Sequence, residues 1–235
     1  MSIVMENANC FDFLPTLKNN SVDLVLIDPP YDILGGSWYK DRSHADDESF
    51  AEWDNELNIL KLLTEMYRVL RSGGTLIMFY DLWKITTLKE CLEISRFKQI
   101  RLIEWLKTNP VPLNGKLNYL TTAREIAITA VKKGKGTFNS QYDNGVYECG
   151  ICREKDRFHP TQKPLKLIEQ LILKHSRIGD IVLDCFFGSG TTAVACLRTD
   201  RNFIGCELSE EYYNKAKFRL EKHTSQNSNE TLIKL

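Results

Sequence analysis

The sequence lacks the features of a membrane or secreted protein. It contains no run of about 18 apolar residues, the length that spans a bilayer, so no membrane segment is expected. Its opening residues, Met1 to Glu6, lack the basic segment followed by an apolar one that marks a secretory signal peptide. The seven cysteines are an odd number and fall mostly in predicted strands and helices, which favours reduced thiols. We therefore expect a cytoplasmic protein.

The sequence also lacks a complete set of metal ligands. Cys149 and Cys152 form the single CxxC pair, and no second pair follows. His159 alone cannot supply the remaining ligands of a four-coordinate zinc site. We predict no metal site, and interpret the pair as two thiols in a loop.

There is no net charge, because 31 Lys and Arg balance 31 Asp and Glu, but the charge is unevenly spread. Residues 1–104 hold 11 basic and 17 acidic side chains, whereas residues 105–180 hold 13 basic and 7 acidic ones. A local basic stretch can attract a polyanion such as a nucleic acid. A solvated face of mixed charge is the alternative interpretation.

What the sequence does contain is an alternation of short apolar runs and amphipathic segments. The predicted strands are Val22–Ile27, Thr75–Tyr80, Ile100–Leu106, Ile126–Val131, Ile181–Leu183 and Phe203–Cys206. The predicted helices are Phe50–Leu70, Leu82–Ile94, Pro164–His175, Thr191–Leu197 and Glu210–Lys222. This alternation predicts an α/β fold with a mostly parallel, doubly wound sheet.

Three segments break the alternation. Residues 32–48 have no apolar period and are predicted to form a mobile loop. Residues 132–158 are rich in lysine, glycine and turn residues, which predicts a polar insertion outside the core. The polar tail from Thr224 is expected to be frayed.

A glycine-containing loop follows the strand that ends at Leu183. Phe186-Phe187-Gly188-Ser189-Gly190 lies between a strand and a helix, where glycine lets the backbone approach a ligand closely. Glu207 follows the next strand, where a carboxylate can accept hydrogen bonds from ribose hydroxyls. Asp184 can bind a cationic amino group or cap the turn. The glycine loop and Glu207 together suggest a nucleoside cofactor, and the missing third glycine disfavours NAD. A merely structural turn is the alternative interpretation.

A second loop, Asp28-Pro29-Pro30-Tyr31, follows the strand that ends at Ile27. Two prolines fix the backbone and remove two N–H donors, so the carbonyl oxygens of this loop can face outward as acceptors. Together with the Asp28 carboxylate they suit an amino group that has two hydrogens to donate. Tyr31 offers a face on which a planar base could stack. A rigid turn with an incidental tyrosine is the alternative interpretation.

With these two loops in this order, the chain resembles the β class of DNA amino-methyltransferases, which use S-adenosylmethionine (SAM). The resemblance covers nearly the whole chain and implies a Rossmann-like methyltransferase fold. It implies a single domain over residues 1–235. This domain would comprise a catalytic half at 1–131, the polar insert at 132–158 as the candidate target-recognition segment, and a SAM-binding half at 159–223.

The resemblance also implies residue roles. Asp28, Pro29, Pro30 and Tyr31 match the catalytic motif, and Asp28 at its head points to adenine N6, because N4-cytosine enzymes typically have Ser there. His159 to Pro164 resembles the segment before the SAM loop. The implied cofactor-binding residues are Asn9, Asp28, Lys163, Asp184, Phe186, Gly188, Gly190, Thr191 and Glu207. Lys163 would meet the methionine carboxylate. Asn9 departs from the family, which usually has Asp there; it could be an ordinary turn residue. The segments Trp105–Pro110 and Arg124-Glu125 also resemble the family, without an assigned role.

The activity implied is methyl transfer to an adenine of double-stranded DNA that has rotated out of the duplex, since chemistry on a stacked base is blocked. Candidate phosphate contacts are Lys132, Lys133, Lys135, Arg153 and Arg157. Whether the enzyme forms a homodimer or has a cognate restriction endonuclease is left open. Alternative functions are methylation of cytosine N4 or of RNA, a catalytically silent DNA-binding subunit, and an NAD-dependent oxidoreductase.

Overall fold

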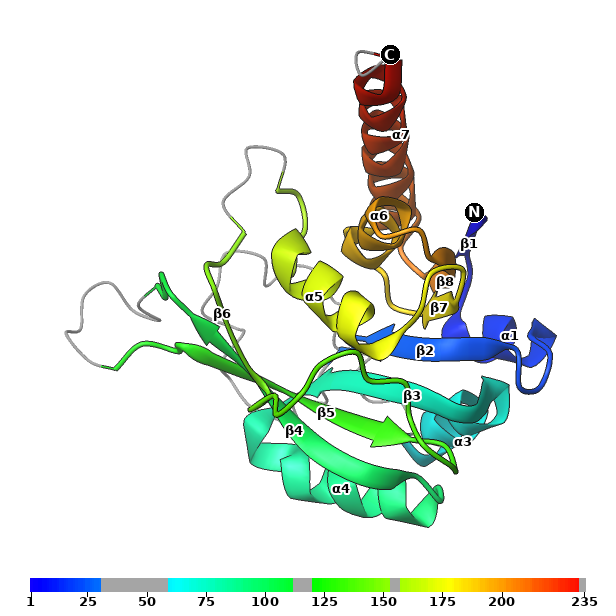
Figure 1. Cartoon of the computed structure of the whole chain (residues 1–235), viewed down its shortest axis with the longest axis vertical. Helices are drawn as coiled ribbons and strands as arrows, with labels where there is room; N and C mark the ends of the chain where they lie inside the picture. Colours follow the sequence, from blue (N-terminus) through cyan, green and yellow to red (C-terminus); the bar gives the residue numbers. More distant parts are fainter. Residues whose placement is uncertain (31–58, 112–119, 153–156, 233–235) are drawn as a thin grey trace.

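The computed structural model describes residues 1–30, 59–111, 120–152 and 157–232, with the side chains of 225–232 excepted. In these ranges eight strands form one continuous sheet in the order β1-β8-β7-β2-β3-β5-β4-β6 (Figure 1). The strands are β1 (Ile3–Asn7), β2 (Val22–Ile27), β3 (Leu70–Tyr80), β4 (Lys98–Lys107), β5 (Arg124–Val131), β6 (Val146–Cys149), β7 (Ile181–Asp184) and β8 (Asn202–Glu207). Of these, β5 runs antiparallel to its two neighbours, and the other pairings are parallel.

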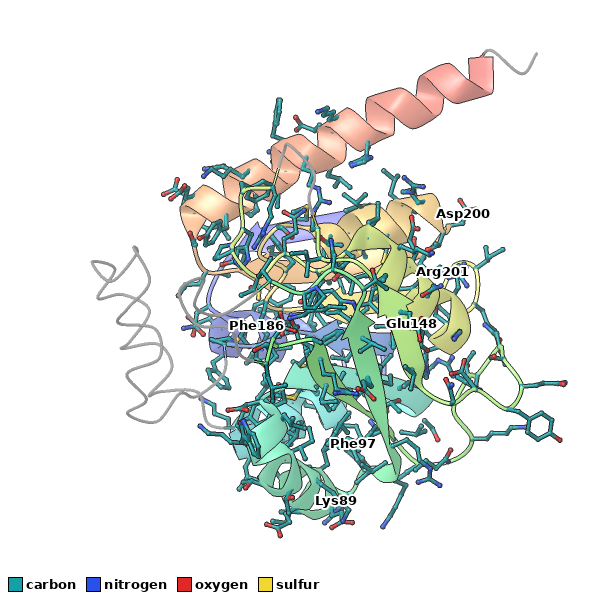
Figure 2. The ribbon with its side chains drawn as sticks, turned by 90° about the vertical axis from the view of Figure 1, so that its left-hand side faces the viewer. Lys89, Phe97, Glu148, Phe186, Asp200 and Arg201 are labelled. Carbon is teal, nitrogen blue, oxygen red and sulfur yellow. The ribbon has the colours of Figure 1, made fainter. Side chains whose placement is uncertain are left out.

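Helices cover both faces of this sheet. They are α1 (Cys10–Phe13), α3 (Ile59–Val69), α4 (Ile85–Ile94), α5 (Leu165–His175), α6 (Thr191–Arg198) and α7 (Glu210–Leu232), with short 3₁₀ turns at Leu14–Thr16 and Leu82–Lys84. One apolar core joins the sheet to α1, α3 and α4, and a second joins it to α5, α6 and α7. Figure 2 shows Lys89 and Phe97 on the α4 side of the molecule, and Arg201 on the α6 side. The predicted doubly wound α/β architecture is confirmed.

The apolar spacing explains why α3 and α5 form where they do. The residues that α5 buries recur at intervals of three and four, and so lie on one side of the helix: Leu167, Ile168, Leu171, Ile172 and His175. The helix begins at Leu165, one residue after its predicted start, because Pro164 is extended and forms the N-cap. In the described part of α3, Leu62, Leu63, Met66 and Val69 are buried in the same way.

The position where the strand order reverses lies between β2 and β7. The chain leaves β2 toward β3 on one side, and leaves β7 toward β8 on the other. Leu24 and Val25 of β2 pair with Val182 and Leu183 of β7, so both strands end at the same edge of the sheet. Ligands of open α/β sheets bind at such a reversal, beyond the carboxyl ends of the strands.

The structure corrects several sequence predictions. Strands β1 and β6 were not predicted, and β6 lies inside the segment 132–158 that was expected to stay outside the core. Tyr147 and Cys149 of β6 are buried in the second core, so that part of the prediction is wrong. The helix α7 continues to Leu232, past its predicted end at Lys222, so the tail from Thr224 remains helical. The predicted loop 32–48 and the first half of the helix predicted at 50–70 lie outside the described residues.

No helix in the described part of the chain has both the length and the apolar character needed to cross a membrane.

Candidate active site

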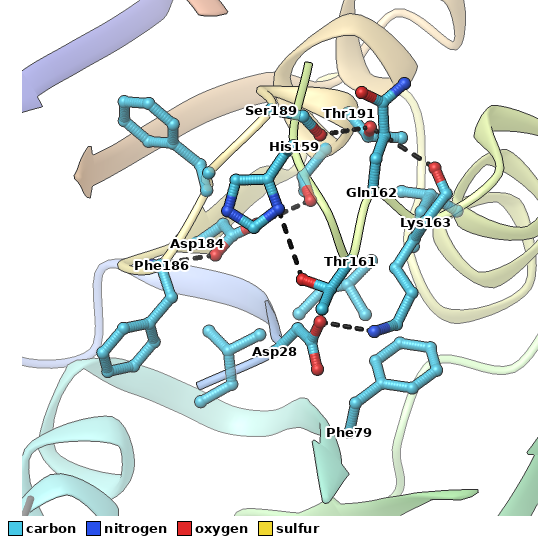
Figure 3. Close-up of a pocket in the computed structure, with 16 residues that line it drawn as sticks. Asp28, Phe79, His159, Thr161, Gln162, Lys163, Asp184, Phe186, Ser189 and Thr191 are labelled. Carbon is cyan, nitrogen blue, oxygen red and sulfur yellow. Dashed lines mark hydrogen bonds and ion pairs between the residues drawn. The ribbon is translucent and has the colours of Figure 1, made fainter. Parts of the chain in front are cut away.

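One pocket lies at the strand-order reversal, beyond the ends of β2 and β7 (Figure 3). Its walls come from distant parts of the chain, because the loop after β2, the end of β3, the segment before α5 and the loop after β7 all reach it. The pocket is lined by six of the residues predicted for cofactor or catalysis: Asp28, Lys163, Asp184, Phe186, Gly188 and Thr191. The two loops singled out in the sequence therefore open into the same pocket.

Asp184 fixes the beginning of the glycine loop. Its carboxylate is buried, and it accepts hydrogen bonds from the Phe186 backbone N–H (3.0 Å) and the Thr192 hydroxyl (2.6 Å). Burial raises the pKa of Asp184 to about 7, although these hydrogen bonds act in the opposite direction. The capping role considered for Asp184 is therefore present in the structure, at a position on the pocket wall.

Gly188 adopts a backbone conformation that other residues rarely adopt. Its φ is +45°, and a Cβ at this position would lie 3.1 Å from Nε2 of His159. The His159 ring packs on Tyr212 with ring centroids 4.4 Å apart, and burial lowers the pKa of His159 to about 4, so this imidazole is neutral near pH 7. A neutral ring thus lies against the glycine, in space that a larger residue would need.

Glu207 holds the other side of the same loop. Its carboxylate accepts from the Gly188 N–H (2.9 Å) and from the Ser209 N–H (3.0 Å). Burial raises the pKa of Glu207, and the backbone hydrogen bonds counteract part of that shift. Each carboxylate oxygen has a second lone pair with which to accept from a ligand hydroxyl.

Asn9 lies at the same edge, next to the end of β8. The Ala8 N–H donates to the Glu207 carbonyl (3.1 Å), which places the loop after β1 beside Glu207. The Asn9 side chain accepts from the Phe11 N–H (2.8 Å) and caps α1. The turn role considered for Asn9 is present, and its proposed contact with the cofactor remains a prediction.

Arg219 of α7 supports the glycine loop from behind. Its buried guanidinium donates to the Ser189 carbonyl (3.0 Å) and to the Thr191 hydroxyl (2.9 Å). Gly190 has φ +70°, and a Cβ there would lie 2.9 Å from the Ala216 side chain, so the loop packs tightly on this helix. Arg219 was not predicted, because it belongs to no motif and its role depends on where α7 packs.

Lys163 joins the two halves of the site. Its ammonium contacts Oδ2 of Asp28 and lies 3.1 Å from Oε2 of Glu125. It also lies over the Phe79 ring, 4.9 Å from its centroid. Burial alone would lower the pKa of Lys163, but the two carboxylates raise it above its ordinary value, so the ammonium stays charged.

The rest of the Asp-Pro-Pro-Tyr loop is described only in part. Pro29 is buried and Pro30 half-buried beside Asp28. Tyr31 lies outside the described residues, and so does Arg153 of the insert. The stacking role of Tyr31 remains a prediction.

Three lysines predicted as DNA contacts lie away from the pocket, and their contact with DNA remains a prediction. Lys132 is buried, and its ammonium donates to Oδ1 of Asn20 (2.8 Å) and to two backbone carbonyls, so it has a structural role. Burial lowers the pKa of Lys132. Lys133 and Lys135 are exposed but lie beside Gly73, at the opposite edge of the sheet from the pocket. Five residues of β3, roughly 16 Å, separate the two edges.

Arg157 remains a candidate contact with DNA. It is exposed, and its guanidinium donates to the backbone carbonyls of His159 (3.3 Å) and Pro160, next to the pocket.

Several pocket residues were not predicted: Phe79, His159, Thr161, Gln162, Ser189 and Thr192. His159 to Gln162 belong to the segment whose resemblance was noted, but only Lys163 had been given a role there. Thr192 could have been found from its place in the first turn of the predicted helix. Among the described residues, no cluster of His, Cys, Asp or Glu is arranged to hold a metal ion.

Comparison with known proteins adds independent findings. Residues 22–218 match the model of a family described as DNA methylase. The chain is 32% identical to the type II methyltransferase M2.MboI of Moraxella bovis, over 94% of this chain and 89% of that protein. It is 31% identical to M2.DpnII of Streptococcus pneumoniae, over 96% and 92% of the two chains.

Solved structures are similar as well. The M1.HpyAVI–SAM complex matches with a TM-score of 0.71 and 31% identity, over 93% of this chain and all of that one. The cytosine-N4-specific PvuII DNA methyltransferase matches with a TM-score of 0.73 over 96% of this chain and 91% of that one. Its identity is 17%, which shows a shared fold alone.

Proposed function

This chain belongs to the DNA methylase family, and from that premise we propose that it transfers the methyl group of SAM to the N6 amino group of adenine in double-stranded DNA. One observation carries the proposal. Asp28, which heads the predicted catalytic loop, and Gly188, at the centre of the predicted cofactor loop, line the same pocket at the strand-order reversal. The relatives named as type II methyltransferases and the SAM complex of M1.HpyAVI support it.

The chemistry of the pocket fits SAM. The ribose of SAM needs acceptors for its hydroxyls. Glu207, which holds the glycine loop at the end of β8, offers carboxylate oxygens. The amino-acid end of SAM carries an ammonium and a carboxylate, and the pocket offers the Asp184 carboxylate and the Lys163 ammonium. Gly188 lines this pocket, and a Cβ there would lie 3.1 Å from Nε2 of His159, so a larger residue would crowd the loop proposed to hold the cofactor. We propose Asn9, Phe186, Gly190 and Thr191 as further parts of this site.

When bound, SAM supplies an electrophilic methyl group on a positively charged sulfur. The protein has to place the adenine amine in line with that group, and alignment alone can account for about 7–11 kcal/mol of barrier reduction in well-oriented systems. The Asp28 carboxylate and the Pro29 carbonyl accept the two N6 hydrogens, which turns the nitrogen lone pair toward the methyl carbon. Methylation would leave the positive charge on the amine nitrogen, and the Asp28 carboxylate, which accepts a hydrogen bond from that amine, would take up the proton that the nitrogen then loses.

The target adenine has to leave the base stack to reach a pocket at the sheet edge. We propose that Tyr31 stacks on the extruded base. We further propose that the insert at 132–158 contributes to target recognition and that Arg157, near its end, contacts the DNA. A homodimer and a cognate restriction endonuclease remain predictions.

Product analysis tests the proposed function. The protein is incubated with unmethylated duplex DNA and methyl-labelled SAM, and the DNA is then digested to nucleosides for mass spectrometry. We expect label in N6-methyladenine. Label in N4-methylcytosine, or transfer to RNA in place of DNA, contradicts the choice of substrate. SAM binding without transfer to any DNA indicates a silent subunit.

A further inference from the structure

Four charged side chains of alternating sign extend from the pocket along the edge of the sheet. Asp28 contacts Lys163, and Lys163 lies 3.1 Å from Oε2 of Glu125. The other oxygen of Glu125, Oε1, lies 2.8 Å from Nζ of Lys107. The Lys107 and Lys163 side chains are 13% and 9% exposed, so water screens these contacts poorly.

The sheet register explains why these residues meet. Asp28 follows the end of β2, and Lys107 ends β4, at the same edge. Strand β5 runs in the opposite direction, so its first residues lie at that edge, and Glu125 pairs with Trp105 of β4. Lys163 enters from the segment before α5 and crosses above Phe79 of β3, which separates β2 from β5.

The arrangement creates a competition for Asp28. In the proposed reaction the Asp28 carboxylate accepts from the substrate amine, yet its Oδ2 already contacts the Lys163 ammonium. A buried ammonium that had Asp28 as its sole counter-charge would hold that oxygen strongly. Glu125 offers the same ammonium a second carboxylate, which it contacts without leaving its place. The Lys163 ammonium can therefore weaken its contact with Asp28 while the Glu125 carboxylate still balances its positive charge.

We propose that Glu125 is a positioning residue: by sharing the Lys163 ammonium with Asp28, it lets Asp28 accept a hydrogen bond from the substrate amine. This inference rests on the proposed function, because it concerns the same reaction at the same pocket. Glu125 touches neither the substrate nor the cofactor in this account, and acts through Lys163. The Lys107 ammonium balances the second oxygen of Glu125 and holds its carboxylate in place.

A neighbouring ion pair provides a matched control. Oε1 of Glu104 in β4 lies 2.5 Å from Nε of Arg124 in β5. This ion pair joins the same two strands as the pair between Lys107 and Glu125 does. The Arg124 side chain is 64% exposed, and Glu104 contacts neither Lys163 nor Asp28 in the described structure. Replacing Glu104 removes a carboxylate and an interstrand ion pair without changing the charges around Lys163.

The test compares Glu125→Gln, Glu125→Asp and Glu104→Gln with the unmodified protein. Single-turnover rates are measured on duplex DNA, SAM affinity by calorimetry, and base extrusion by the fluorescence of 2-aminopurine placed at the target adenine. We expect Glu125→Gln to slow methyl transfer about 10- to 100-fold, as small displacements in active sites do. SAM affinity and the 2-aminopurine signal should change less than about threefold, because the variant keeps every group proposed to touch SAM or the base and Asp28 still balances the Lys163 ammonium. Glu125→Asp should give an intermediate rate, and Glu104→Gln the unmodified rate.

Three results would overturn the inference. One is a Glu125→Gln variant that transfers methyl groups at the unmodified rate. Another is a loss of SAM affinity as large as the loss of rate, which would make Glu125 a support of the cofactor site. The third applies if Glu125→Gln does not fold. In that case a Glu125→Asp variant that transfers methyl groups at the unmodified rate overturns the inference. An unmodified protein that binds SAM but methylates no DNA refutes the proposed function itself, a distinguishable failure.

Discussion

Lys163 donates a hydrogen bond to Asp28, although the two residues are 135 positions apart in the sequence. Asp28 belongs to the loop after β2, and Lys163 to the segment that precedes α5 and the glycine loop. Their contact joins the proposed base-binding half of the pocket to the proposed cofactor-binding half.

The fit of Gly188 can be tested against a second glycine. Gly188→Ala combines a positive φ with a Cβ that would lie 3.1 Å from Nε2 of His159 and press on this ring, so we expect about 1–3 kcal/mol lower stability and much weaker SAM binding. Gly179→Ala is the control, because Gly179 has φ +81° and a Cβ there meets nothing within 4 Å. That variant should lose stability and keep its SAM affinity. Denaturant unfolding and calorimetry measure both, and equal SAM affinity in the two variants would contradict the cofactor loop assignment.

The carboxylate of Glu207 should contribute to cofactor affinity and not to the transfer step. Replacing it by Gln removes charge from an acceptor that hydrogen bonds the Gly188 N–H, and hydrogen bonds to charged groups contribute about 1.5–3 kcal/mol. We expect SAM affinity to fall by about 10- to 100-fold, with the rate at saturating SAM nearly unchanged. Calorimetry together with single-turnover kinetics tests this. Unchanged affinity would place the ribose elsewhere.

SAM binding should depend on pH through Asp184. Burial raises the pKa of this carboxyl to about 7 in the folded protein, so below that pH it is protonated and cannot pair with the SAM ammonium. Affinity should therefore rise with pH, by up to about tenfold per pH unit below 7, and level off above it. Glu207, whose pKa burial also raises, acts in the same direction. His159 has a pKa of about 4 and does not titrate in this window.

The raised pKa of Asp184 also makes the stability of the protein without SAM depend on pH. Between the ordinary carboxyl pKa and about 7 the folded state binds the Asp184 proton more tightly than the unfolded chain does. The contribution of Asp184 to the free energy of unfolding is therefore full at low pH and is lost as the pH rises through about 7. Asp184→Asn should remove this loss, together with the part of the pH dependence of SAM affinity that Asp184 contributes, and leave the part due to Glu207. An unaltered pH profile in the variant would refute the assignment.

The salt dependence of DNA binding tests where the DNA lies. Each phosphate contact contributes about 0.9 to the slope of log affinity against log salt. We expect Arg157→Ala to reduce the slope by about that amount, because Arg157 is exposed beside the pocket. Lys135→Ala is the control at the opposite sheet edge, and its slope should stay unchanged. The reverse pattern would place the DNA on the other edge.

The pocket could be predicted from sequence because each motif directly follows a strand. Parallel strands end at one edge, so the positions of Asp28 after Val22–Ile27 and of the loop around Gly188 after Ile181–Leu183 predict that the two loops meet. The prediction needed only the existence of the strands and a common direction. The apolar runs report the strands, and the helical segments between successive strands favour a common direction, because parallel neighbours need a crossover connection.

The position of Glu125 at the pocket edge and the burial of Lys132 could not be predicted in the same way. Glu125 reaches the pocket edge only because β5 runs antiparallel, and an apolar run does not state its direction. Lys132 lies in a basic tract that is typical of a nucleic-acid contact. Its long side chain nevertheless turns inward over the Tyr67 ring to reach the carbonyl oxygens of Arg68 and Leu70. Both outcomes depend on tertiary packing.

Asp28→Asn tests the central claim that donor and acceptor share this pocket. The variant keeps the shape of the side chain and removes the carboxylate, so we expect the single-turnover rate of methyl transfer to fall at least about 10²–10³-fold, as loss of a key polar group does in other active sites. SAM affinity, measured by calorimetry on the same sample, should stay within about threefold. A variant that methylates adenine at the unmodified rate would contradict the account.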